Sequence, residues 1–494
     1  MPARHAPAAP AGVPHAEAES RAVPPPPSAP GPGAAPAHGA ARALRPPVPA
    51  AEELSGLALM RAFGRNALVA WAGEAYREEL VVRRFLGVNS LLVNAPEGIR
   101  RVLVDNPGNY RRTPATVRVL RPLLGDGLFL AEGEAWRRQR RIVAPSFAPR
   151  ATPMIARTSA QVADETVAEL DEPARAGRDV DLLAAVQSVA LEVAGRTMMS
   201  LEMARHRPGL RALVAEYRER LGRPVPLDFL LPLWLPGPHD LMRRGFRRRW
   251  MARIEAMIAD RRSRPPAPAD APRDLFDILA AARDPDTGAG FTDRQLRDQV
   301  ATLITAGHET TALALFWSLT LLAQSPAWQD AVAAEAAAAN PAPEAAADAL
   351  PGLPVTRAVF QEAVRLYPPA YTVVRQAIAA DTVAGVTVGP GWLMVIAPWV
   401  LHRHHGRWDD PDAFDPARFL PPAPPPDRFA YLPFGAGPRV CIGAQFAMTE
   451  GVLVLARLVR AFRIELADDA PVLPVAIVTV RPDRTPVFRL TPRS

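Results

Sequence analysis

Residues 434–443 read Phe-Gly-Ala-Gly-Pro-Arg-Val-Cys-Ile-Gly, and they hold the only cysteine, Cys441, in a chain of 494 residues. A single cysteine excludes an internal disulfide and a zinc site built from several cysteines. Two glycines before the cysteine and one after it let the backbone turn tightly against a bulky planar group. The stretch therefore predicts a functional loop built around one sulfur atom.

An apolar helical pattern begins at residues 442–443 and continues to Leu458. Cys441 is thus expected at the N-terminal end of a helix, where free N–H groups stabilise a thiolate and weaken its electron donation. A lone thiolate in such a setting suits axial ligation of haem iron. Taken by itself, the loop also leaves open a structural or redox role for the cysteine.

Composition and charge narrow the class of protein. The chain has 58 basic and 51 acidic residues, a formal charge of +7, and 49% hydrophobic residues, enough for a large core. Every basic residue other than histidine is arginine, and the two signs of charge are well mixed. Nucleic-acid binding calls for a clustered basic face, so we do not expect it.

Two regions are distinguished along the chain. Residues 1–50 are rich in proline and alanine, and we predict that they are disordered. Residues 51–494 are predicted to form one large catalytic domain. The N-terminal region lacks the apolar run of a secretory signal. The longest apolar run, near residues 311–323, is shorter than the ~20 residues that span a bilayer. We therefore expect a cytoplasmic protein without a transmembrane anchor.

The local patterns predict a mainly α fold with a smaller β region. Short apolar runs at 80–82 and 91–93, separated by a turn at 87–89, favour a β-hairpin, and Pro96 opens a short helix. Residues 151–324 are mostly helical in pattern, with breaks at 222–238 and 265–272. Further strands are expected at 372–377, 383–388 and 392–396.

A long proline-free helix is predicted over residues 293–324, with Ala-Gly-His-Glu-Thr-Thr at 306–311 in its middle. Mid-helix glycine costs about 1 kcal/mol relative to alanine, and threonine hydroxyls can bond back to the preceding turn. The loosened helix would form a groove for a small ligand. Glu309 and Thr310, an acid and an alcohol, could there relay protons to bound dioxygen. Alone, the motif equally fits an ordinary kinked core helix.

Two weaker patterns each pair complementary groups on one helix face. Glu362 and Arg365 lie three residues apart, and Arg418 could join them if the chain folds back. Trp136 and Arg140 lie one turn apart, and their N–H groups are good donors to carboxylates such as haem propionates. The first pattern alone is also common on protein surfaces, and the second also fits an amphipathic surface helix.

Together, and in this order, these four elements resemble the cytochrome P-450 superfamily, the haem-thiolate monooxygenases. Residues 434–443 match the family pattern F-x-x-G-x-R-x-C-x-G at every defined position, and the resemblance covers about residues 54–490. It implies a single large domain with the cytochrome P-450 fold and haem b as cofactor. One departure is Ala417, where the family more often has glutamate.

The resemblance also implies roles for individual residues. Cys441 is expected to ligate the iron, with Phe434 beside the sulfur and Gly443 in the loop. The propionate partners are expected to be Trp136, Arg140, Arg375 and Arg439. Glu309 and Thr310 are expected to be the catalytic acid–alcohol pair, whereas His308 is expected to pack or form hydrogen bonds. The expected structural network comprises Glu362, Arg365 and Arg418.

The implied reaction inserts one atom of dioxygen into an apolar substrate and releases the other as water. Electrons from NAD(P)H would arrive through separate proteins, a ferredoxin with its reductase or a flavodoxin-type donor. Arg137, Arg138 and Arg141 could form a basic docking face for such a donor, or they could simply be solvated. A peroxide-driven peroxygenase and a non-catalytic haem sensor are the rival functions; neither needs the Glu309–Thr310 pair.

The apolar segment 222–238 lies, by the same resemblance, in the substrate-entry region, and Tyr371 to Val374 lie near the haem. An apolar substrate is therefore expected, such as a fatty acid, a terpenoid or a steroid-like molecule. The apolar segment could instead touch a membrane surface or pack within the protein.

Overall fold

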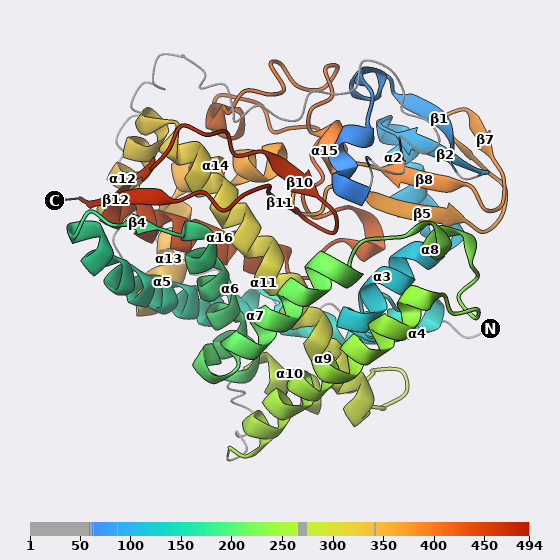
Figure 1. Ribbon diagram of the computed structural model, residues 1–494, viewed down its shortest axis with the longest axis horizontal. Coiled ribbons are helices and arrows are strands. Elements are labelled where there is room, and N and C mark those ends of the chain that lie inside the picture. The colour runs from blue at the N-terminus through green and yellow to red at the C-terminus, as the bar shows by residue number, and fades with distance from the viewer. Residues whose placement is uncertain are drawn as a thin grey trace, which may run out of the picture. The chain divides into compact units, whose positions relative to one another are not determined.

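The computed structural model describes residues 59, 62, 64–85, 87–264, 274–339 and 342–493, all within one compact unit of the chain, residues 39–494. These residues form a mainly helical structure with a smaller β region, as predicted (Figure 1). The predicted disordered segment 1–50 lies outside the described residues, as does the whole of the predicted break at 265–272.

Helices of between 4 and 31 residues make up most of the described structure. In chain order they are α2 (Pro96–Arg100), α3 (Pro114–Leu124), α4 (Gly133–Val143), α5 (Thr152–Arg175), α6 (Leu182–Met199), α7 (Arg207–Glu216), α8 (Pro226–Leu230), α9 (Pro238–Arg262), α10 (Leu275–Ala281), α11 (Asp293–Ala323), α12 (Pro326–Ala339), α13 (Ala346–Ala349), α14 (Pro354–Leu366), α15 (Pro398–Leu401) and α16 (Ala444–Ala461).

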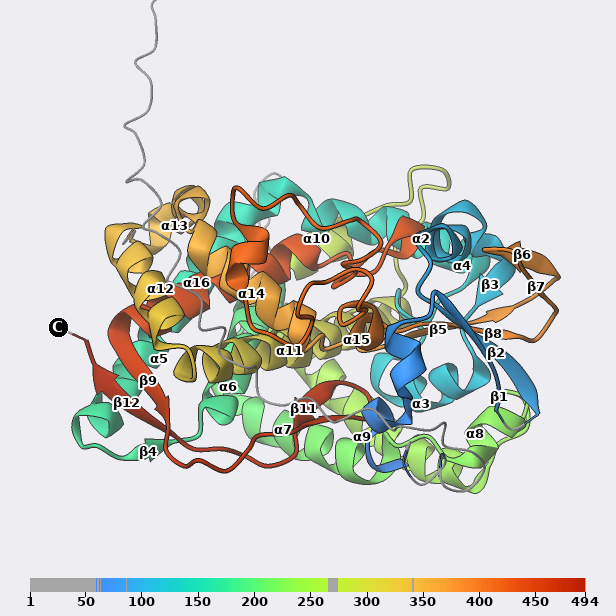
Figure 2. The same ribbon diagram turned by 90° about the horizontal axis from the view of Figure 1, so that it is seen from above.

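Helix α11 is the central element and runs through the middle of both ribbon views (Figures 1 and 2). Its N-terminus is capped by the Thr292 hydroxyl, which accepts from the N–H of Gln295, and the helix continues for 31 residues without a break. It packs against α6, α14, α16, α3 and α9. Trp317 stacks on Tyr367 with ring centroids 4.1 Å apart, which ties α11 to the end of α14.

The largest sheet has the strand order β1-β2-β8-β5-β3, formed by β1 (Leu80–Phe85), β2 (Val88–Val93), β8 (Leu393–Ile396), β5 (Val373–Ala377) and β3 (Tyr110–Arg111). The predicted hairpin is confirmed, with Val82 opposite Leu91 in an antiparallel pair. Strand β8 then pairs with β2 in parallel and with β5 antiparallel. The sheet thus brings residues near 375 beside residues near 111.

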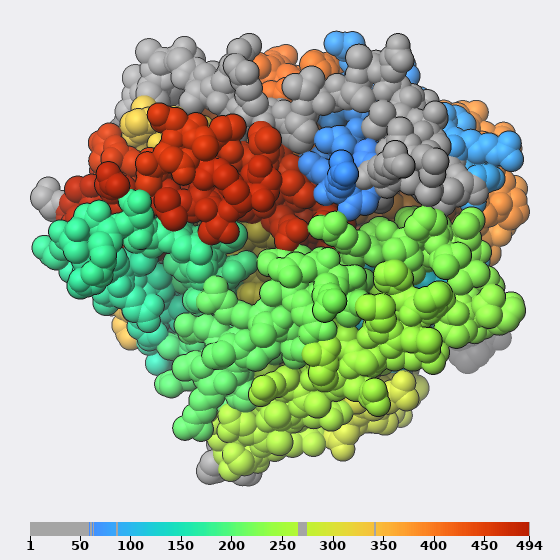
Figure 3. Space-filling view, viewed as in Figure 1, coloured from blue at the N-terminus to red at the C-terminus, as the bar shows by residue number. Residues whose placement is uncertain are grey.

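Smaller sheets come from the C-terminal part of the chain. Strand β12 (Phe488–Pro492) lies between β4 (Asp179–Val180) and β9 (Phe462–Leu466), and β10 (Pro474–Ala476) pairs with β11 (Val480–Pro482). These C-terminal strands, in red, share one face of the protein with the green helices α7 to α9 (Figure 3).

Two predicted elements need correction. Residues 383–388 do not form one strand: β6 (Asp381–Val383) and β7 (Val386–Val388) pair across a turn in which Ala384 and Gly385 have φ of 45° and 85°. The sequence pattern does not predict this turn, because valines on both sides of it make the segment resemble one strand. The predicted break at 222–238 contains the short helix α8, since Pro226 occupies a first-turn position where its missing N–H costs nothing.

Helix α6 is long and apolar enough to cross a membrane by length and composition alone. Within the described part of the chain, 67% of its apolar window is buried against other elements. It packs on α11 and α5, which is the position of a core helix.

Candidate active site

The cysteine loop is held by tight backbone geometry. The N–H of Cys441 donates to the carbonyl oxygen of Phe434 at 2.9 Å, which closes the loop at its base. Gly435 and Gly437 have φ of 71° and 73°, a region that favours glycine. A Cβ atom at Gly437 would lie 1.9 Å from the carbonyl oxygen of Leu103. Only glycine therefore lets the loop pack against residues 101–105.

Cys441 lies two residues before Gly443, the N-cap of α16. Burial raises the pKa of the Cys441 thiol, while a hydrogen bond from the backbone N–H of Gly443 and the charge of Arg140 lower it. The cysteine is nevertheless exposed on one side, although its loop is otherwise mostly half-buried. The sulfur therefore faces open space from an otherwise enclosed position.

Helix α4 lies against the cysteine loop through both of its predicted residues. The Arg140 guanidinium donates to the carbonyl oxygen of Val440 at 3.0 Å, next to the cysteine. The Arg439 guanidinium lies 4.4 Å from the centre of the Trp136 ring, in the geometry of a cation–π contact. Trp136 and Arg140 therefore act on the same loop.

Two guanidinium groups share one carboxylate beside this loop, and a third guanidinium lies near them. Arg112 donates to Glu132 Oε1 at 2.9 Å, and Arg439 pairs with the other oxygen of Glu132. Arg375, on β5, makes its hydrogen bond only to the backbone oxygen of Val374. Burial, together with the charges of Arg112 and Arg439, lowers the pKa of Arg375 to about 9. The cluster has more positive charge than its own carboxylate can balance.

The motif on α11 borders open space from inside the core. Ala306 is exposed, whereas residues 301–304 and 311–322 of the same helix are buried. The Thr310 hydroxyl donates to the Ala306 carbonyl oxygen at 2.6 Å, the predicted bond to the preceding turn. Because the Ala306 carbonyl oxygen accepts from this side chain, it competes with the backbone hydrogen bond of the helix, and such competition can loosen the helix locally.

The surroundings of Glu309 and His308 favour the uncharged form of each side chain. Glu309 Oε1 accepts from the Thr479 hydroxyl at 3.2 Å, and burial raises the pKa of the Glu309 carboxyl. Burial, together with the charge of Arg211, lowers the pKa of His308 to about 4, so the ring is neutral near pH 7. No hydrogen bond joins the side chains of Glu309 and Thr310, both of which the structure describes.

Behind the cysteine loop, Glu362 and Arg365 form a fully buried pair with an N–O distance of 2.6 Å. Arg365 also donates to the carbonyl oxygens of His402, Pro411 and Ala413. Arg418 Nε lies 3.5 Å from Glu362 Oε1, so the chain does fold back as expected. Arg418 carries the weakest contact of the three.

Sequence reasoning missed His402, which links this network to the cysteine loop. Its Nδ1–H donates to the Arg365 carbonyl oxygen at 3.2 Å, and its Nε2 accepts from the N–H of Leu432 at 2.8 Å. Burial lowers its pKa to about 3, so the ring stays neutral. A histidine in the sequence Leu-His-Arg-His-His gives no sign of this position.

Arg112 was missed for a different reason. It follows Arg111 in a short segment before Pro114, and residue type alone does not separate a buried arginine from an exposed one. Its 8% exposure results from β3 pairing with β5, which also carries Arg375. The signal that could have found Arg112 is its position after Tyr110 at the edge of a strand, where successive side chains face opposite sides.

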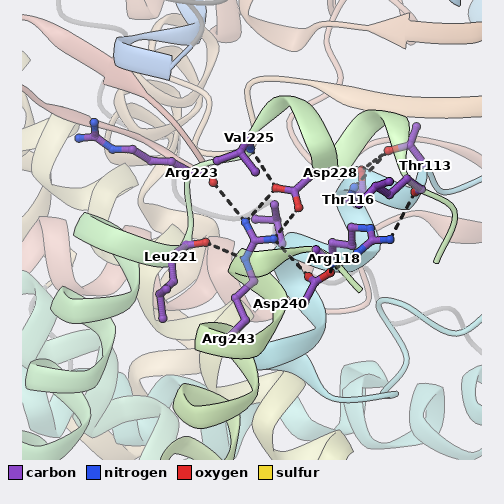
Figure 4. Close-up of polar contacts among 12 residues, drawn as sticks. Thr113, Thr116, Arg118, Leu221, Arg223, Val225, Asp228, Asp240 and Arg243 are labelled. Atoms are coloured by element: carbon purple, nitrogen blue, oxygen red, sulfur yellow. Dashed lines mark hydrogen bonds and ion pairs between the residues drawn. The ribbon is translucent and has the colours of Figure 1, made fainter. Parts of the chain in front are cut away.

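The apolar segment 222–238 is exposed at its tip and anchored at its base. The exposed side chains include Leu227 (43%), Leu230 (54%), Leu233 (50%), Trp234 (80%) and Leu235 (42%). Arg243 pairs with Asp228 at 2.7 Å, and Arg118 pairs with Asp240 and donates to the Pro232 carbonyl oxygen at 2.6 Å (Figure 4). The interpretation that the segment packs within the protein is therefore wrong for those five side chains.

The site's donors fit a haem. The exposed thiol of Cys441 can supply one ligand to a metal ion. The described residues contain no cluster of three or more His, Cys, Asp or Glu side chains that could hold a metal ion without further ligands. A porphyrin brings its own four nitrogens and two carboxylates, which match the lone sulfur and the surplus guanidinium charge around Glu132. The fold and site thus define a haem-thiolate protein.

Comparisons with known proteins agree. The family model for cytochrome P450 matches residues 55–484. Cyclooctat-9-en-7-ol 5-monooxygenase of Streptomyces melanosporofaciens is 34% identical over 396 residues, which cover 78% of this chain and 82% of that relative. Pentalenene oxygenase of Streptomyces avermitilis is 30% identical over 404 residues, covering 81% and 87%. A crystal structure of a cytochrome P450 has a TM-score of 0.73 at 25% identity and covers 85% of this chain and 93% of that one.

The chain belongs to the cytochrome P450 family. It is a haem-dependent monooxygenase that inserts one atom of dioxygen into an apolar organic substrate. The predicted class of enzyme and its fold are thereby confirmed.

Proposed function

We propose that Cys441 ligates the haem iron and that the arginine cluster binds the haem propionates. The observation that carries this assignment is that an exposed thiol lies beside two guanidiniums that share one carboxylate and a third, Arg375, that has no carboxylate partner among the described residues. Trp136, Arg140, Arg375 and Arg439 are the propionate partners, and Arg112 joins them. Phe434 and Gly443 shape the loop, and Glu362, Arg365 and Arg418 support it from behind.

When bound, the haem supplies reductive activation of dioxygen and transfer of one oxygen atom to the substrate. The protein's part is to exclude water and to present protons at defined atoms. The raised pKa of Glu309 favours a proton on its carboxyl, and Thr310 Oγ1 lies on the exposed side of α11 near Ala306. A change in the Thr310 side-chain rotation would free its hydroxyl from Ala306 to pass a proton on.

The substrate is a terpenoid skeleton, cyclic or linear. This choice is supported by the names of two relatives, a cyclooctat-9-en-7-ol 5-monooxygenase and a pentalenene oxygenase. It is also supported by a chamber beside α11 whose walls are largely apolar, with Leu210, Val214 and Ile477 among them. Fatty acids and steroid-like molecules are the other apolar classes to include in a binding screen.

Electrons come from NAD(P)H through a separate ferredoxin or flavodoxin-type protein, and the enzyme works in the cytoplasm. The three arginines suggested for docking differ in their surroundings. Arg138 and Arg141 lie 3.7 and 3.2 Å from Asp284, whereas Arg137 pairs only with Glu134 on its own helix. Arg137 is therefore the best candidate for contact with an electron donor.

Replacing Thr310 with alanine tests the proton-delivery role. Loss of the hydroxyl removes the donor next to Glu309, so we expect product formed per NAD(P)H to fall about 10-fold or more, with hydrogen peroxide released instead. Thr311→Ala, which removes the neighbouring buried hydroxyl, is the matched control. Coupled turnover in Thr310→Ala, with a normal carbon monoxide difference spectrum, would contradict the proposal and favour a peroxide-driven enzyme or a different proton route.

A further inference from the structure

Two cavities meet on one side of α11. The first is a chamber with about 740 Å³ of space between atoms, a volume that includes its opening to solvent. Its wall is mostly apolar and comes from α3, α6, α7, α9, α11 and the β10–β11 turn: Leu123, Leu191, Leu210, Val214, Tyr217, Trp250, Ile304, Ile477 and Val478.

The second cavity is a polar mouth that opens between α7 and the C-terminal strands. Four residues line both cavities, so the chamber and the mouth are continuous: Arg211, Arg218, Glu309 and Arg481. Figure 3 shows the face concerned, hollowed between green α7 and the red C-terminal segment. We call Arg211, Arg218, Arg223 and Arg481 the mouth arginines.

Three of the four mouth arginines have no carboxylate partner among the described residues, and the fourth has only a distant one. Among the described residues, no carboxylate lies within ion-pair distance of Arg211, Arg223 or Arg481. The nearest carboxylate to Arg218 is Glu219 at 4.0 Å, and the buried Nε of Arg218 has no acceptor. Figure 4 shows the Arg223 side chain pointing away from the Asp228–Arg243 pair, to which Arg223 contributes only its carbonyl oxygen.

The acids of the mouth are engaged elsewhere. Asp181 caps α6 by accepting from the N–H of Ala184, and Asp483 accepts from the N–H of Leu473. Glu309 bonds to Thr479 and forms no ion pair with a described arginine. Burial lowers the pKa of Arg481, and the charges of Arg218 and Arg223 lower it further. Like charges held together at a cavity entrance are stabilised when an anion binds between them.

We propose that the mouth arginines bind an oxyanion, a carboxylate or a phosphate, at one end of the enzyme's substrate, while the substrate's apolar body lies in the chamber. This rests on the proposed monooxygenase function and adds a charged end to the substrate class. Guanidinium groups bind such oxyanions through paired, charge-assisted hydrogen bonds. A chamber without polar anchors would hold an apolar body in many orientations, so the anionic end fixes which carbon faces the haem.

Three C20 probes that differ only in the end group test this proposal: geranylgeranoic acid, geranylgeranyl monophosphate and geranylgeraniol. Binding to the haem-loaded enzyme is measured by calorimetry, which detects binding whether or not the spectrum changes, and by the visible difference spectrum. We expect at least one anion to bind about 10-fold more tightly than the alcohol in low salt. Its advantage should shrink as salt is raised. Which anion binds better tells a carboxylate substrate from a phosphate one.

The variants Arg481→Gln and Arg218→Gln should each lower anion affinity about 10-fold and leave alcohol affinity unchanged. Arg489→Gln is the matched control, since Arg489 lies on β12 outside the mouth and is already paired with Asp179 at 2.9 Å. Unchanged alcohol binding also shows that a variant is folded and that its chamber is intact.

Equal affinity for the acid, the phosphate and the alcohol would overturn the proposal. So would anion binding that survives in Arg218→Gln/Arg481→Gln. Both results leave the haem-thiolate spectrum and turnover of a neutral terpenoid in place. A failure of the proposed function itself would remove the spectrum or the turnover, so the two failures are distinguishable.

Discussion

Single atoms decide whether the cysteine loop can form. Gly435 and Gly437 share a positive φ, but only Gly437 is pressed against another part of the backbone, the Leu103 carbonyl oxygen. The sequence predicts that the backbone needs a positive φ here, because glycines cluster before the cysteine. The close contact at Gly437 depends on where residues 101–105 lie, which no local pattern indicates.

The two glycines therefore make a matched pair of substitutions. Gly435→Ala meets no atom within 4 Å and should cost about 1 kcal/mol of folding free energy, from its positive φ alone. Gly437→Ala adds a steric clash that only backbone movement relieves, so we expect a loss of about 3 kcal/mol or more. The measurement is the urea midpoint of each variant. Similar midpoints would show that residues 101–105 move aside without cost.

At the scale of elements, a buried ion pair within α14 holds residues 411–415 through hydrogen bonds to their backbone groups. Glu362 accepts two hydrogen bonds from Arg365 and one from the N–H of Asp415. The Glu–x–x–Arg spacing predicts the pair, but it is the same spacing as in exposed pairs of little value. Burial makes the difference, because a lone charge left in the core is costly.

Replacing Glu362 with glutamine tests that difference. The neutral side chain leaves the fully buried Arg365 without a counter-charge, and we expect unfolding free energy to fall by about 3 kcal/mol or more. Glu216→Gln is the control, because its two-bond pair with Arg249 is largely exposed. That control should cost under about 1 kcal/mol. The measurement is urea denaturation of both variants. If both lose the same unfolding free energy, burial does not determine how much the ion pair contributes to stability.

At the scale of the whole molecule, the face that carries α4 and the cysteine loop is the expected contact for an electron donor. Two of the three arginines that the sequence offered for docking are paired with Asp284, which lies far along the chain. The net positive field on this face is therefore smaller than the run of arginines indicates. Arg137 remains, 56% exposed and paired only within its helix.

Charge reversal at Arg137 should slow electron transfer from the donor protein severalfold in low salt, because steering by opposite charges raises association rates. The difference should vanish at about 0.5 M salt. Arg175→Glu is the control, because Arg175 is also exposed and paired only within its helix, with Asp171. The measurement is the second-order rate of haem reduction. A rate that is independent of Arg137 in low salt places the docking contact elsewhere.

The sequence by itself determined the cysteine loop, the long helix 293–323, the first hairpin and the mainly α class. Each depends on residues close together in the chain, where spacing and glycine position act directly on the backbone. Tertiary structure alone decided which arginines share a site. Arg112 and Arg439 pair with Glu132 and lie near Arg375, and Arg211, Arg218, Arg223 and Arg481 line the mouth. An arginine's surroundings depend on distant segments packed against it, because the long side chain forms its contacts wherever the fold brings an acceptor.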